Sequence, residues 1–124
     1  MQDLTKKSAR NSLASSFLGK NVKIIIDRPQ GSSHPKYPDM IYPVNYGYIP
    51  NTVSGDGEEL DVYLLGVNEP VKEYEAKIIG IIHRKNDNED KLVAVPEGVK
   101  VTIEEIEDAI RFQEKYFDSY IEML

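Results

Sequence analysis

The run Ala76-Lys77-Ile78-Ile79-Gly80-Ile81-Ile82-His83 predicts a long β-strand, because four of its eight residues are isoleucine. A polar connection over residues 85–90 follows it. The next apolar run, Lys91–Val95, ends at Pro96-Glu97-Gly98, which is a turn signal. The two runs together predict a pair of neighbouring strands.

Shorter runs of the same kind lie on the N-terminal side of this pair. Val22–Ile26, Val44–Ile49 and Val62–Leu65 each predict a short strand, and turn-forming residues separate them. The longest separating segment, Pro29–Pro43, predicts a loop, and loops of this length are usually functional or disordered. Short strands without interleaved helices predict a mainly β (α+β) fold, built on a small antiparallel barrel or sheet.

One amphipathic helix is predicted after the strands. Thr102-Ile103-Glu104-Glu105 is a capping-box pattern with Thr102 at the N-cap. Roughly helical spacing relates the residues Ile103, Ile106, Ile110, Gln113, Phe117 and Ile121. We expect this C-terminal helix to pack on the barrel. Residues 1–20 are expected to form an N-terminal arm, flexible or packed as a short helix on another subunit, and residues 21–124 a single domain.

Composition excludes several classes of site. The chain has 124 residues, no cysteine and a formal net charge of −6. Without cysteine there is neither a disulfide nor a thiolate metal site, and a nucleic-acid partner would require a basic surface. No apolar run approaches the ~20 residues of a membrane span, and residues 1–20 lack the apolar core of a secretory signal. We therefore expect a cytoplasmic protein that binds neither nucleic acid nor membrane.

The acidic segment Asp56-Gly57-Glu58-Glu59-Leu60-Asp61 is the first candidate site. Its carboxylates Asp56, Glu58 and Asp61 can converge on one mouth of a barrel. Carboxylates held that close repel each other, so a divalent cation would stabilise them, and oxygen ligands favour Mg²⁺, Mn²⁺ or Ca²⁺. An Asp-Gly turn whose carboxylates face water explains the same pattern without a metal.

A second acidic cluster, Asp87, Glu89 and Asp90, lies on the predicted polar connection. A polar hairpin turn has this composition too. Two carboxylate groups on different loops are, however, what a site for several metal ions requires. Cationic and phenolic side chains offer further contacts to phosphate oxygens: Lys36, Lys91, Tyr46 and Tyr116. For each tyrosine the alternative is a ring packed in the core.

The longest motif is Tyr42-Pro43-Val44-Asn45-Tyr46-Gly47-Tyr48-Ile49, followed by Gly55–Val62. It resembles the signature of soluble family I inorganic pyrophosphatases, and the likeness extends to Lys91–Pro96 and Phe112–Tyr116. The resemblance implies a five-stranded OB-like barrel with a C-terminal amphipathic helix. It also implies Mg²⁺ or Mn²⁺ as cofactor, hydrolysis of pyrophosphate or a related phosphoanhydride, and self-association into a homo-oligomer.

The resemblance assigns roles by position. Metal ligands of the family are matched by Asp27, Asp56, Asp61, Asp87 and Glu89. Catalytic positions are matched by Glu58, Asp61 and Tyr46, with Glu58 where the family has the aspartate that accepts a proton from the attacking water. Phosphate-binding positions are matched by Lys36, Tyr46, Lys91 and Tyr116.

The sequence departs from the family pattern in several places. Only Pro38–Ile41 separates the lysine-bearing loop from the Tyr42–Ile49 motif, where the family has a long hairpin. Phe117 stands where the family has a lysine, and Glu58 and Glu89 replace aspartates. These departures keep two other functions open: a barrel that binds metal and phosphate or a nucleotide with little hydrolysis, and a barrel that only assembles.

Two alignments of the first strand are open. In the preferred one, Asp27 is an outer metal contact and Lys36 belongs to the family's lysine loop, which also accounts for Gly31-Ser32. In the other, Asp27-Arg28 matches a later Asp-Arg pair of the family, and Arg28 is the phosphate-binding arginine.

Overall fold

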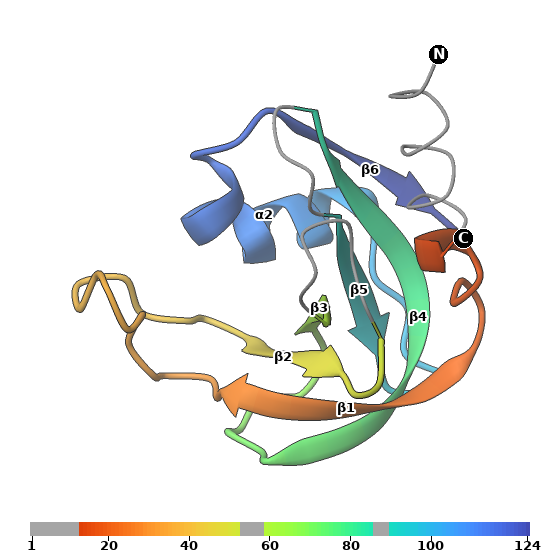
Figure 1. The fold of residues 1–124 in the computed structure, drawn as a ribbon, viewed down its shortest axis with the longest axis horizontal. Helices are drawn as coiled ribbons and strands as arrows, with labels where there is room; N and C mark the ends of the chain where they lie inside the picture. Colours follow the sequence, from red (N-terminus) through yellow and green to blue (C-terminus); the bar gives the residue numbers. More distant parts are fainter. Residues whose placement is uncertain (1–12, 53–58, 86–89) are drawn as a thin grey trace.

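The computed structural model describes residues 13–52, 59–85 and 90–124 (Figure 1). Within these residues the elements are β1 (Asn21–Arg28), β2 (Asn45–Ile49), β3 (Leu60–Leu64), β4 (Glu73–Arg84), β5 (Lys91–Val95), α2 (Ile103–Glu114) and β6 (Ser119–Met123). Residues 13–15 are also helical. Nowhere in the described residues is a helix both long and apolar enough to cross a membrane.

The strands form a closed barrel with one extension. The sheet order is β1-β2-β3-β5-β4-β6, and β1 also pairs with β4, so the first five strands close on themselves (Figure 1). This arrangement confirms the predicted mainly β, five-stranded OB-like barrel with a C-terminal helix. The prediction of a wholly antiparallel barrel was wrong, because β3 and β5 pair in parallel.

Strand β4 holds the barrel together, since it pairs with three neighbours. Its first part pairs with β1, its middle with β5 and its last part with β6. A register shift between Ile78 and Gly80 interrupts the pairing with β5, and such irregularities let a strand bend around a barrel. The predicted pairing of this strand with Lys91–Val95 is confirmed.

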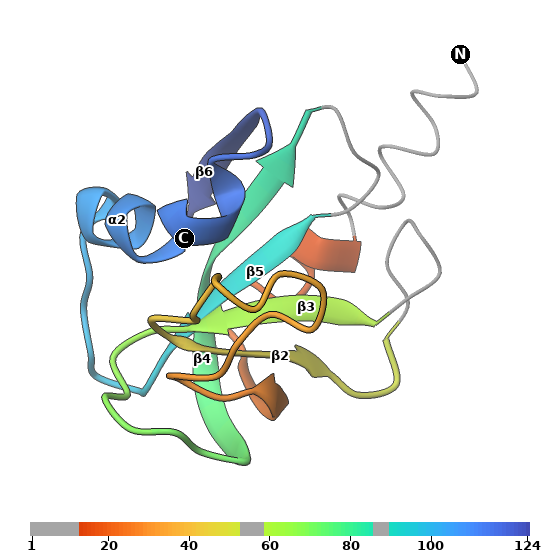
Figure 2. The same cartoon turned by 90° about the vertical axis from the view of Figure 1, so that its left-hand side faces the viewer.

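On the side of the barrel formed by β3 and β5, both faces of the strands are buried. Alternate residues of β3 and β5, such as Leu60, Val62 and Leu92, fill the barrel interior. Of the residues that alternate with them, Tyr63 and Val93 belong to a second cluster, in which they pack with apolar side chains of α2. Figure 2 shows α2 and β6 together on one side of the barrel. The outer wall of β3 and β5 is therefore covered by the helix.

The helix begins as predicted and ends earlier than predicted. Thr102 and Glu105 form the capping box, but α2 stops at Glu114, and Ile121 lies in β6 opposite Ile82. The last part of β4 extends beyond β1, and its edge carries backbone groups that need hydrogen-bond partners. A strand satisfies those groups and a continued helix does not, so the helical spacing of residue 121 was misleading.

Part of the predicted N-terminal arm packs on the chain's own barrel. Ala14 is fully buried, and Leu13, Phe17 and Leu18 pack against the barrel core. The Gly19 N–H donates to the carbonyl of residue 78 at 2.8 Å. Residues 1–12 lie outside the described part of the chain.

Gly47 marks the closest backbone approach between β1 and β2. A Cβ atom at this position would lie 1.8 Å from the Ile25 carbonyl oxygen. We expect Gly47→Ala to lower the free energy of unfolding by about 3 kcal/mol or more, because the backbone of β1 must move. Urea denaturation followed by circular dichroism measures this loss.

Gly98→Ala is the matched control. Gly98 has a φ of +85°, but nothing lies within 4 Å of its added Cβ, so only the left-handed strain of about 1–2 kcal/mol applies. Equal losses in the two variants would contradict the role given to Gly47.

Candidate functional site

A pocket of about 970 Å³ lies between the barrel wall, the loop over residues 29–43 and the end of α2. Asp61 and Lys91 line it, and they alternate with the inward-facing Leu60, Val62 and Leu92. The two charged side chains therefore project from the outer wall of the barrel. Asp56 and Glu58, which were predicted to converge with Asp61 at a mouth of the barrel, lie outside the described residues.

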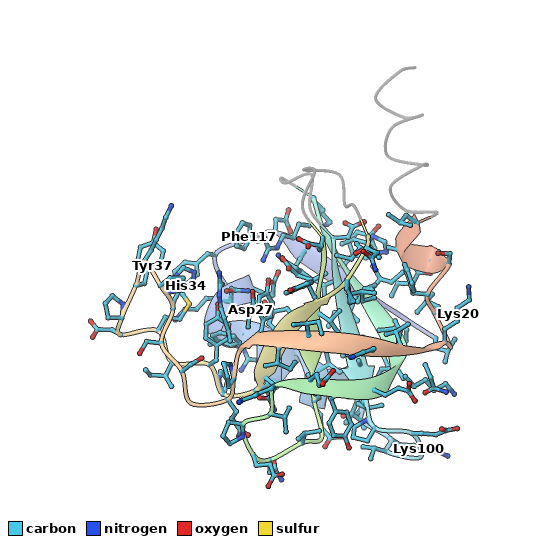
Figure 3. The ribbon with its side chains drawn as sticks, turned by 60° about the horizontal axis from the view of Figure 1, so that its bottom comes forward. Lys20, Asp27, His34, Tyr37, Lys100 and Phe117 are labelled. Atoms are coloured by element: carbon cyan, nitrogen blue, oxygen red, sulfur yellow. The ribbon has the colours of Figure 1, made fainter. Side chains whose placement is uncertain are left out.

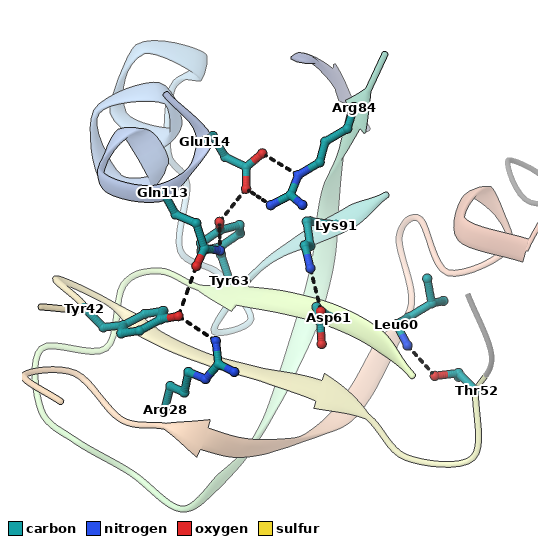
Figure 4. A network of polar contacts seen from close by, with 10 residues as sticks. All are labelled: Arg28, Tyr42, Thr52, Leu60, Asp61, Tyr63, Arg84, Lys91, Gln113 and Glu114. Atoms are coloured by element: carbon teal, nitrogen blue, oxygen red, sulfur yellow. Dashed lines mark hydrogen bonds and ion pairs between the residues drawn. The ribbon is translucent and has the colours of Figure 1, made fainter. Parts of the chain in front are cut away.

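Asp61 and Lys91 are brought together by the parallel pairing of β3 and β5, which sets them opposite each other. Lys91 Nζ donates to Asp61 Oδ2 at 2.5 Å (Figure 4). The lysine is buried and the aspartate is partly exposed to the pocket. Glu59 and Asp90, which belong to the two acidic segments and directly precede β3 and β5, stand at this same end of the barrel.

A chain of hydrogen bonds leads from Arg28 towards the helix (Figure 4). Arg28 Nη1 donates to the Tyr42 hydroxyl at 2.7 Å, and this hydroxyl donates to Gln113 Oε1 at 3.0 Å. Gln113 Nε2 then donates to the Tyr63 hydroxyl at 2.6 Å, and Tyr63 donates to Glu114 Oε2 at 2.6 Å. Burial, reinforced by Glu114, raises the pKa of Tyr63 well above its usual value, so Tyr63 keeps the proton that it donates.

Arg84 ends this chain on the other side. Its Nε and Nη2 donate to the two carboxylate oxygens of Glu114 at 3.0 and 2.6 Å, and both side chains are buried. The guanidinium carbon lies 3.6 Å from the centre of the Phe117 ring. A bidentate ion pair at one edge and an aromatic ring at one face fix the orientation of the Arg84 guanidinium.

Charges of both signs line the pocket. The cations are Arg28, Arg84, Lys91 and Lys115, and the carboxylates are Asp27, Asp39 and Asp61. Partial burial raises the pKa of Asp27; Arg28 opposes this rise, and Asp61 and Glu59 add to it. Asp27 and Asp61 line the same pocket, and their carboxylate oxygens are of the kind that a hard divalent cation prefers. Among the described residues, no three acidic or histidine side chains form a metal site by themselves.

The predicted site residues divide into three groups. Those that line the pocket are Asp27, Tyr46, Asp61, Lys91 and Tyr116. Lys36 is exposed on the loop over residues 29–43 and is not part of the described lining, although its backbone N–H donates to His34 Nδ1. Those that lie outside the described residues are Asp56, Glu58, Asp87 and Glu89.

Sequence reasoning missed Arg84 and Glu114, and it considered Arg28 only in the alternative alignment. A signal for the buried polar chain was present in Gln113, which interrupts the apolar stripe of the predicted helix, because a polar residue on a buried face needs an internal partner. Arg84 had no comparable signal. It follows the isoleucine run, in which apolar residues occupy both faces of the strand. Alternation of polar and apolar residues therefore does not indicate on which face Arg84 lies.

Several known proteins resemble this chain. Residues 17–123 match the family model described as inorganic pyrophosphatase. A curated inorganic pyrophosphatase of Saccharolobus solfataricus is 40% identical over 86 residues, which cover 64% of this chain and 50% of the relative. One from Xylella fastidiosa is 31% identical over 103 residues, covering 67% of this chain and 58% of the relative. The chain thus spans about half the length of these curated relatives.

Solved structures show the same fold. The inorganic pyrophosphatase from Ehrlichia chaffeensis superimposes with a TM-score of 0.66 at 22% identity, covering 86% of this chain and 87% of that one. The enzyme from Neisseria gonorrhoeae superimposes with a TM-score of 0.63 at 24% identity, covering 79% and 74%. At these identities the likeness concerns the barrel and its topology.

The buried pair of Arg84 and Glu114 should be important for stability. We expect Glu114→Ala to lower the free energy of unfolding by about 3–5 kcal/mol, because it leaves a buried guanidinium without its carboxylate. Urea denaturation measures the effect.

Asp108→Ala is the control on the same helix. Asp108 pairs with Arg111 at the surface, at 2.8 Å, and such exposed pairs contribute about 0.5 kcal/mol or less. If both variants lose the same small amount, the buried pair does not stabilise the site as argued.

Proposed function

This chain belongs to the inorganic pyrophosphatase family, and we propose that it hydrolyses pyrophosphate to two phosphates with Mg²⁺ or Mn²⁺. The observation that carries the proposal is the Asp61–Lys91 pair at 2.5 Å on the wall of one pocket. A carboxylate suited to a divalent cation and an ammonium group suited to a phosphate oxygen stand side by side there. Metal-bound pyrophosphate requires both kinds of contact.

Asp61 and Asp27 are the described residues that would hold a cation. Asp61 uses one oxygen towards Lys91, and a carboxylate has further lone pairs to offer. We assign the other metal contacts to Asp56, Asp87 and Glu89, which lie outside the described residues. When bound, the divalent cation lowers the pKa of water and neutralises phosphate charge.

The cations of the pocket would bind the phosphoryl oxygens. Lys91 Nζ and the Arg28 guanidinium lie 5.6 and 5.7 Å from the centre of the Tyr46 ring, so both positive groups lie near this buried ring. Groups held in place before the substrate arrives stabilise developing charge without reorganising. We assign Tyr46 and Tyr116 as hydrogen-bond donors to phosphate and Glu58 as the acceptor of the proton from the attacking water.

Arg84 favours turnover over the binding-only and assembly-only alternatives. Phe117 stands where the family pattern has a lysine, but its ring packs on the Arg84 guanidinium, which lines the pocket. A positive charge is therefore present beside this position, contributed by β4 and not by the helix. Because Glu114 already fixes the orientation of the Arg84 guanidinium, binding a substrate beside it costs no further side-chain entropy.

Cytoplasmic localisation and homo-oligomeric assembly stay predictions, as do the division into a 1–20 arm and a 21–124 domain and the role of Lys36 in binding phosphate. They follow from the sequence pattern and the family resemblance. Sedimentation velocity of the full chain tests the assembly.

Asp61→Asn should nearly abolish phosphate release from pyrophosphate in the presence of Mg²⁺, with a loss on the order of 10²–10³-fold. It should also reduce the Mg²⁺-dependent rise of the melting temperature, since a weaker ligand binds the cation less tightly. A colorimetric phosphate assay and thermal denaturation measure the two effects. The exposed Asp108→Asn on α2 serves as control and should leave both unchanged, whereas full activity of Asp61→Asn would show that the site assignment is wrong.

Arg28→Gln should lower kcat/KM for pyrophosphate about 10- to 100-fold, because a charge-assisted hydrogen bond to phosphate is lost. Lys36→Gln, on the exposed loop, should have a much smaller effect. Steady-state kinetics with Mg²⁺ compare the two variants. The reverse order of effects would favour the alignment in which Lys36 binds phosphate and Arg28 does not.

A further inference from the structure

We propose that the outer part of the pocket binds the base of a nucleoside 5′-diphosphate, so that the chain also hydrolyses this class of phosphoanhydride. The inference rests on the proposed function, because the same floor of cations and carboxylates would hold the two phosphoryl groups. It adds a binding surface for an organic group, which pyrophosphate does not have.

The size of the pocket is the first argument. Its volume of about 970 Å³ lies near the upper end of the ~300–1,000 Å³ found for sites that enclose organic ligands. Pyrophosphate contains no carbon and occupies only the charged part. Apolar side chains such as Met40, Ile41 and Phe112 line the remainder, and they offer nothing to a small, highly charged anion.

The arrangement of the lining is the second argument. The floor is made of buried polar side chains, Tyr46, Arg84 and Lys91. The rim carries large side chains that are exposed: Tyr37 (60%) and Ile41 (50%). Exposed large hydrophobic groups gathered around one opening indicate a binding surface. A phosphate-binding floor below an apolar rim fits a ligand with a phosphorylated end and an organic end.

The aromatic side chains of the rim indicate which organic group of a ligand it would bind. Figure 3 shows His34 and Tyr37 on the loop that extends from the barrel beside Asp27, and their ring centres are 5.1 Å apart. Aromatic faces of this kind stack on nucleobases with little regard to sequence.

Polar groups on the rim argue against an aliphatic ligand. Asp39 and Lys115 line the same opening, and the Lys115 ammonium lies 5.3 Å from the centre of the Tyr116 ring. An alkyl or prenyl chain would desolvate these charges without compensating them. The polar edge of a base can instead exchange hydrogen bonds with them.

The reaction balances with water as the only co-reactant. The oxygen of water bonds to the terminal phosphorus, and the bond from that phosphorus to the bridging oxygen breaks. The bridging oxygen leaves with its electron pair on the nucleoside monophosphate. The products are the monophosphate and phosphate, and one proton passes to solvent at neutral pH.

Tyr37→Ala tests the inference by activity, because Tyr37 belongs to the rim and not to the phosphate floor. With ADP and Mg²⁺ we expect kcat/KM to fall about 5- to 150-fold through the loss of stacking. With pyrophosphate it should stay within about twofold. Tyr120→Ala, a truncation of an exposed tyrosine on β6 outside the described pocket lining, should alter neither substrate. Equal changes for ADP and pyrophosphate in Tyr37→Ala would overturn the inference.

Equilibrium binding separates this inference from the proposed function. AMP and ribose 5-phosphate have no phosphoanhydride, so calorimetric titration of the full chain with either needs no turnover. We expect AMP to bind more tightly, with the advantage lost in Tyr37→Ala. This result would support the base site even if pyrophosphate is not hydrolysed. Equal binding of the two, or tighter binding of geranyl monophosphate than of AMP, would overturn it even if pyrophosphate is hydrolysed.

Discussion

The parallel pairing of β3 and β5 is the constraint on which the site depends. Two parallel neighbours begin at the same end of a sheet, so the chain segments that enter β3 and β5 arrive side by side. Asp61 and Lys91, the first charged residues of the two strands, therefore stand opposite each other. The connection between two parallel strands must cross over, and β4 makes this crossing while it also closes the barrel against β1. The same strand order therefore closes the barrel and places Asp61 beside Lys91.

The second requirement is to hold positive groups rigidly in an acidic protein. The chain carries a formal charge of −6, yet Arg28, Arg84 and Lys91 all border one pocket. Each is held by the protein itself: Lys91 by Asp61, Arg84 by Glu114 and Arg28 by the hydroxyl of Tyr42. Hydrogen bonds through Gln113 and Tyr63 join the last two arrangements. An anionic substrate meets a preorganised surface, and the local charge matters more than the net charge.

Much of the fold could be predicted from local patterns, and the errors share a cause. β-Branched runs located the strands, and the capping box located the start of α2. The parallel pair, the early end of the helix and the position of Asp61 and Lys91 on the outer wall could not be predicted in this way. Each depends on which strand lies beside which, and neither β-propensity nor helical spacing contains that information. Ile121 illustrates this, because its partner on β4 decided its conformation.

By itself, the sequence determined the family, the barrel class and the pocket residues Asp27, Tyr46, Asp61, Lys91 and Tyr116, since long motifs and strand periodicity are local properties of the chain. Only the tertiary structure decided that Arg84, from the end of β4, packs on Phe117 and pairs with Glu114. It also decided that Arg28 borders the pocket while the side chain of Lys36 stays on an exposed loop. The reason is physical: a buried charge is tolerated only where distant segments supply its partners, and those segments meet only when the barrel closes.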